Sequence, residues 1–157
     1  MAAGYDGEGA SMTTRLTSVA PDLVGLLARQ TPERQRDVAL AVSAWIVDRV
    51  GLVDARADTA LEQLRAQHYG STPERDALRG LVDELDEAAW ELQEQVDGGS
   101  APRSRYLEAF ALARAAAALW CALDADAKNG AVEAAYEAQA AVGEVGGVRQ
   151  IVERIVR

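Results

Sequence analysis

Apolar residues recur every three or four positions along most of the chain, which is the spacing of one face of an α-helix. Two segments, 31–50 and 72–96, show this spacing most clearly. Their apolar positions are Val38, Val42, Ile46 and Val50 in the first and Leu78, Leu81, Leu85, Ala88, Leu92 and Val96 in the second. No segment alternates apolar and polar residues as a half-buried strand does. The pattern therefore predicts amphipathic helices joined by loops.

Both helices begin with the same four residues, Thr-Pro-Glu-Arg, at positions 31–34 and 72–75. A Thr side chain at the N-cap accepts a backbone N–H, and a Pro at the next position has no N–H to leave unbonded. The Glu carboxylate lies where the helix dipole favours negative charge. Such a recurrence fits either an internal repeat or a common way of starting a helix. The second explanation is the simpler one, because the segments do not align beyond these residues.

Further helices are predicted after Pro21, near 54–70, and over 102–124, 130–142 and 147–157. The segment 102–124 has charges on no single face and contains nine consecutive apolar residues, 115–123. A helix that is apolar on all sides is buried, so we expect this one at the centre of the fold. We predict an all-α, single-domain bundle of six or seven helices over residues 16–157. A flexible, Gly-rich arm is predicted over residues 1–15.

Composition and charge exclude several classes of protein. With 157 residues, of which 49% are hydrophobic, the chain can bury a core without a metal or a disulfide. Its longest apolar run is far shorter than the ~20 residues of a membrane helix. A net charge of −9 disfavours binding to nucleic-acid phosphates. The lone cysteine and the absence of a signal-peptide pattern predict a cytoplasmic protein.

Few residues could carry catalysis. The only Cys, Cys121, lies inside the apolar run, and the only His, His68, closes a different helix. No nucleophile therefore has an evident base, and one Cys with one His cannot form a structural zinc site. No glycine-rich phosphate loop is present. We expect a protein without a cofactor, without a metal and without enzymatic activity.

One acidic edge keeps an enzymatic alternative open. Helix 72–96 carries glutamates at spacings of three and four, namely Glu84, Glu87, Glu91 and Glu94. This edge is similar to the Glu-x-x-Glu motifs of all-α nucleoside-triphosphate pyrophosphohydrolases, and the resemblance implies a Mg²⁺-dependent phosphohydrolase. Those enzymes need matching acids on a second helix, and Glu133 and Glu137 lack the family's Glu-x-x-Asp spacing. A solvated acidic face is the simpler interpretation.

Negative charge is concentrated in the second half of helix 72–96. Between positions 83 and 97 there are seven acidic residues and no basic one. At about 100° per residue, Trp90 points about 130° away from the apolar stripe. Its neighbours on the helix surface are Asp83, Asp86, Glu87, Glu94 and Asp97. A tryptophan among carboxylates is either covered by another helix of its own fold, the more frequent arrangement, or exposed as the anchor of a docking surface.

Three functional hypotheses follow from these features. The first is a non-enzymatic inhibitor of the immunity or antitoxin type that docks on a basic protein partner through Trp90 and its acidic neighbours. The second is a bundle that binds or sequesters a small molecule. Tyr106, Phe110 and Trp120 form an aromatic line on helix 102–124, which is either core or the wall of an apolar pocket. The third is the Mg²⁺-dependent phosphohydrolase. The oligomeric state stays open.

Overall fold

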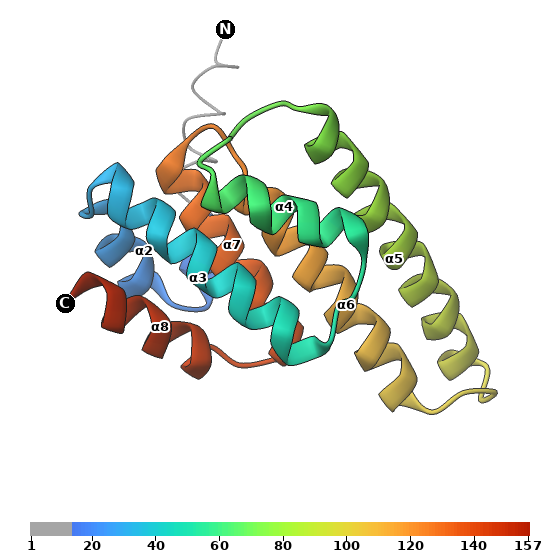
Figure 1. The fold of residues 1–157 in the computed structure, drawn as a ribbon. Coiled ribbons are helices and arrows are strands. Elements are labelled where there is room, and N and C mark those ends of the chain that lie inside the picture. Colours follow the sequence, from blue (N-terminus) through green and yellow to red (C-terminus); the bar gives the residue numbers. More distant parts are fainter. Residues whose placement is uncertain (1–13) are drawn as a thin grey trace, which may run out of the picture.

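A computed structural model describes residues 14–157 as seven α-helices and one 3₁₀ helix, and this part of the chain contains no strand (Figure 1). In chain order these are η1 (Arg15–Ser18), α2 (Pro21–Ala28), α3 (Pro32–Val50), α4 (Ala55–Arg65), α5 (Pro73–Asp97), α6 (Arg103–Ala122), α7 (Ala127–Val142) and α8 (Gly146–Val156). The prediction of an all-α bundle of six or seven helices is confirmed. None of these helices combines the length and the apolar content that crossing a membrane requires.

The predicted N-terminal arm, 1–15, falls mostly on residues 1–13, which lie outside the described residues. Its last residue, Arg15, begins η1 and is bound to the rest of the fold by ion pairs. The next residue, Leu16, is fully buried. The helical domain therefore includes Arg15.

The helix ends follow from capping chemistry. Thr31 and Thr72 each accept the backbone N–H of the Arg three residues later, at 3.2 and 3.0 Å, as predicted. α7 begins three residues earlier than the apolar pattern indicates. The reason is Asp126, whose carboxylate accepts the backbone N–H of Asn129 at 2.8 Å and so caps the first turn. Gly51 ends α3 with φ of 73°, a left-handed conformation that favours glycine.

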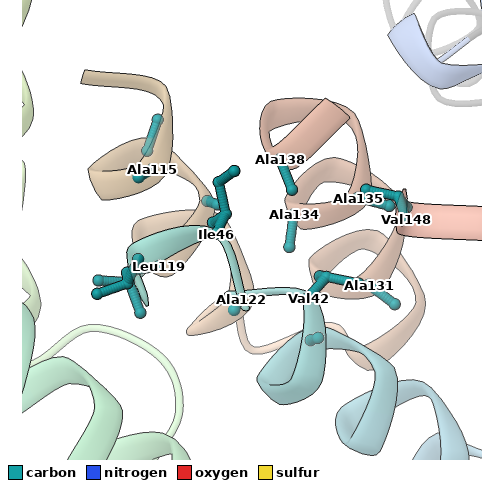
Figure 2. Close-up of a cluster of buried hydrophobic side chains, with 14 of the residues drawn as sticks. Val42, Ile46, Ala115, Leu119, Ala122, Ala131, Ala134, Ala135, Ala138 and Val148 are labelled. Atoms are coloured by element: carbon teal, nitrogen blue, oxygen red, sulfur yellow. The ribbon is translucent and has the colours of Figure 1, made fainter. Parts of the chain in front are cut away.

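The core forms where α3, α6, α7 and α8 meet, and alanine is its most frequent residue (Figure 2). The side chains labelled there are Val42 and Ile46 of α3, Ala115, Leu119 and Ala122 of α6, Ala131, Ala134, Ala135 and Ala138 of α7, and Val148 of α8, all fully buried. Small side chains allow close helix approach: a Cβ added at Gly130 would lie 3.2 Å from the backbone oxygen of Cys121. The helix predicted to lie at the centre of the fold, α6, is therefore buried in its second half, and α7 lies beside it at the centre.

α5 and α6 form an antiparallel pair whose connecting loop lies apart from the other helices, at the lower right of Figure 1. α4 also packs on α5, and Arg56 from its first turn donates to the carboxylate of Glu84 at 2.9 and 3.0 Å. The main neighbour of α5 is α6. We define residues 85–112, the part of the pair around the loop that joins the two helices, as the hairpin tip.

Candidate functional site

Trp90 lies on the hairpin tip, and 66% of its surface is exposed to solvent. Helix geometry accounts for this exposure. Ala89 is only 5% exposed and faces α6, and each successive residue is rotated by about 100°. No helix within residues 14–157 covers the indole. The alternative in which the fold buries this ring, which the sequence favoured, is wrong.

The seven acidic residues between positions 83 and 97 divide into two groups. Three are paired with arginines: Asp83 with Arg79 at 3.3 Å, Glu84 with Arg56 at 2.9 Å, and Asp86 with Arg114 at 2.6 Å. The other four are exposed and form no ion pair with any residue of the described chain: Glu87, Glu91, Glu94 and Asp97. All four belong to the hairpin tip. We define Trp90 with these four carboxylates as the acidic face.

A second apolar side chain is exposed on the same tip. Leu107 is 47% exposed and precedes Arg114 by two helical turns, so the two residues share one face of α6. Trp90 follows Asp86 by one turn on α5. Asp86 and Arg114 are bonded to each other, and along their helices Trp90 and Leu107 both lie between this ion pair and the connecting loop.

The structure separates the three aromatic residues of the predicted line on α6. The rings of Tyr106 and Phe110 contact each other, with centroids 5.8 Å apart, and both residues are half-buried. Trp120 lies elsewhere, beneath the guanidinium groups of Arg75 and Arg79 at 3.9 and 5.0 Å from its ring. These residues therefore do not meet around one apolar pocket.

Trp120 instead borders a polar cleft of about 270 Å³ between η1, α5, α6 and α7. Its charged lining residues are Arg15, Arg79, Asp86, Arg114 and Glu137. A larger cavity of about 520 Å³ lies between α2 and the first turn of α7. Its lining within residues 14–157 is Thr14, Val24, Ala28, Asp126, Lys128, Asn129 and Val132, none of which is aromatic.

An ion-pair network centred on the buried Glu137 connects the α5–α6 pair with η1 and α7. Glu137 is 3% exposed. It accepts a hydrogen bond from Arg114 at 2.8 Å and forms an ion pair with Arg15 at 2.9 Å. Arg114 is also bonded to Asp86, and Arg15 to Glu133, each at 2.6 Å. The sequence does not predict this network, because its members come from η1, α5, α6 and α7. Its only sequence signal is a pair of glutamates in an alanine-rich helix.

The protonation states in the cleft do not favour catalysis by its thiol. Burial raises the pKa of the Cys121 thiol to about 12, and the nearby carboxylates of Glu137 and Glu133 raise it as well. Cys121 is therefore protonated at neutral pH and is a poor nucleophile. Burial lowers the pKa of Arg114, but its acidic partners outweigh this effect and raise the pKa overall. Arg114 therefore stays positively charged at neutral pH.

Within the described residues, no three His, Cys, Asp or Glu side chains come together as ligands for a metal ion. Glu84 is bonded to Arg56 of α4, and that hydrogen bond lowers the pKa of its carboxyl group. Glu133 and Glu137 are bonded to arginines in the cleft. Within the described residues, the glutamate edge of α5 therefore has no second helix of free carboxylates opposite it, which the all-α phosphohydrolases require.

Comparison with models of protein families, with curated proteins and with solved structures finds no match for this chain.

Proposed function

We propose that this chain is a non-enzymatic binding protein that docks on a basic protein partner through the acidic face, as inhibitors of the immunity or antitoxin type do. The observation that carries the proposal is the 66% exposure of Trp90. Burying a tryptophan removes about 150–250 Å² from water, and Trp is enriched among the residues that dominate interface energies. An exposed indole at a helix-pair tip is therefore suited to anchor a partner.

The unpaired carboxylates specify the chemistry of that partner. They place four negative charges around Trp90 and have no basic partner within residues 14–157. A basic surface is attracted to such a face, which accelerates association and orients the encounter. The same charges repel each other when two copies of this chain meet face to face. Charge complementarity therefore favours a different, basic protein over self-association.

The architecture of the tip supports the same function. Trp90 and Leu107 give the face an apolar centre, and the carboxylates provide a polar rim, which is the usual anatomy of a specific interface. Both apolar residues lie on helices, so little backbone freedom is lost on binding. A cytoplasmic location suits the free thiol of Cys121, which has no second cysteine to pair with.

The experiment is to retain partners on the immobilised protein at low salt, identify them, and measure their affinity for matched variants. Trp90→Ala should weaken binding by about 2 kcal/mol or more and leave the melting temperature nearly unchanged. Val53→Ala is the matched control, because Val53 is 90% exposed in the loop before α4 and lies outside the tip. It should change neither quantity. Undiminished affinity of the Trp90→Ala variant would overturn the proposal.

Charge variants complete this experiment. Glu94→Lys should slow association with the retained partner, and the effect should shrink at high salt, because charges separated by more than about 10 Å are screened at 0.1 M. Glu62→Lys, an exposed acid on α4, is the control and should have a smaller effect. Asp86 is unsuitable for this purpose, because its reversal would also break the bond to Arg114. Association rates that are equal for both variants would contradict docking through the acidic face.

A further inference from the structure

Aromatic rings in this protein are usually covered by arginines of the same chain. Five of the seven described rings have a guanidinium carbon within 6 Å of their centroid: Trp45 with Arg49 at 5.8 Å, Tyr69 with Arg36 at 3.6 Å, Phe110 with Arg114 at 5.7 Å, Trp120 with Arg75 at 3.9 Å, and Tyr136 with Arg15 at 4.3 Å. Tyr106 packs against Phe110 instead. Among the described rings, only Trp90 has neither an arginine nor another ring beside it.

One of these arginines shows which groups a guanidinium requires in this fold. Arg114 lies over the ring of Phe110 and donates to two carboxylates, those of Asp86 and Glu137. The aromatic face attracts the cation, and the carboxylate oxygens accept its N–H groups, which point outward in the guanidinium plane. One ring and two acids thus bind a single arginine.

Trp90 has the same set of groups around it with no cation between them. Glu87 precedes it by three residues and Glu94 follows it by four, and residues at these spacings are surface neighbours on a helix, with Cβ atoms about 5–6 Å apart. Both carboxylates are exposed and lack an ion pair within the described chain. Tryptophan is also the aromatic residue that attracts cations most strongly.

We propose that Trp90, Glu87 and Glu94 bind an arginine side chain of the partner, with its guanidinium stacked on the indole and its N–H groups donated to the two carboxylates. This inference rests on the proposed function. Arginine is favoured over lysine because the guanidinium is planar, loses its hydration more readily than an ammonium group, and presents several donors in one plane. The partner is thus a protein that exposes arginine on its basic surface.

The test compares two labelled peptides of equal length and charge, an oligo-arginine and an oligo-lysine nonamer, binding to the full chain at fixed low ionic strength. Fluorescence anisotropy gives the two affinities. The arginine peptide should bind about two- to fivefold more tightly, the range of a cation–π contact at an exposed site. Trp90→Leu, which keeps an apolar side chain without the ring, should abolish that ratio, and Trp90→Phe should restore part of it.

Substitution of the flanking acids tests the carboxylate part of the proposal. The double variant Glu87→Gln with Glu94→Gln should reduce the arginine-to-lysine affinity ratio, whereas Glu62→Gln on α4 should leave it unchanged. Equal binding of the two peptides to the unmodified chain, or a ratio that survives in Trp90→Leu, would overturn the arginine site and leave the docking proposal standing. Failure of both peptides to bind at low salt would overturn the docking proposal as well.

Discussion

Removing the buried carboxylate of Glu137 tests whether the ion-pair network holds the hairpin on the bundle. Its side chain is 4% exposed and is the common partner of Arg114 and Arg15. Replacement by Leu leaves Arg114, itself only 17% exposed, with Asp86 as its one remaining partner. Breaking a buried pair by removing one member costs about 3–5 kcal/mol, because it leaves a desolvated charge. We expect about 3 kcal/mol for Glu137→Leu, since both arginines keep a second carboxylate.

A double-mutant cycle separates the ion pair from the packing of the new side chain. Arg114→Met removes the other charge, and the double variant Glu137→Leu with Arg114→Met leaves no unpaired charge at that contact. The loss of unfolding free energy in the double variant should therefore be smaller than the sum of the two single losses, by about 1–3 kcal/mol. Urea unfolding followed by far-UV circular dichroism gives each value.

Glu62→Leu is the control, because Glu62 is exposed on α4 and a surface substitution of this kind changes stability by about 0.5 kcal/mol or less. A loss below about 1 kcal/mol for Glu137→Leu would place this residue in the range of surface ion pairs and refute the reasoning. Strict additivity in the cycle would do the same, because it would mean that Glu137 and Arg114 do not act as a unit.

Two further predictions concern the packing of α8 and the buried thiol. A Cβ at Gly147 would lie 2.7 Å from the Trp45 ring, so Gly147→Ala should cost about 1–3 kcal/mol in urea unfolding, and much less when Trp45 is also replaced by Ala. The pKa of Cys121, raised by burial from 9.0 to about 12, predicts that iodoacetamide at about pH 8 modifies it only after unfolding. The unfolded thiol ionises first as the pH rises, so the stability advantage of the native chain over Cys121→Ala should be constant below pH 9.0 and decrease between 9.0 and about 12.

The helices could be predicted from the sequence because their signals are local. Thr31 and Thr72 cap the helices that the pattern assigned to them, and the apolar spacing identified each α-helix. The errors lie at the ends of helices. α7 starts early because of the Asp126 cap, and α4 ends at Arg65 rather than near residue 70. After α4 the chain turns through Gln67, which has a positive φ of 61°.

The site could be predicted only in part, because helical periodicity assigns a residue to one side of its helix without showing which helix lies opposite. Trp90 was correctly placed among carboxylates, yet its exposure depends on which helices pack beside α5, and that is a tertiary property. The same limit applies to Trp120: its position on α6 was predictable, but the arginines that cover its ring come from α5.

The distribution of arginines explains why the negative charge of α5 is concentrated at the tip. Arg56 of α4 and Arg114 of α6 each pair with an acid of α5 at or before position 86, and the carboxylates of α5 beyond it form no ion pair with any residue of the described chain. Carboxylates that served only solubility would not need an indole among them. An exposed indole leaves a large apolar surface in contact with water, which is unfavourable. Under the proposed function the two features belong together, because a partner's arginines would complete at Trp90 the pairing that the chain's own arginines complete at Phe110. Arg114 would then have two roles. It orients the hairpin through Glu137, and its partner Asp86 is the last acid along α5 that is paired with an arginine of the chain.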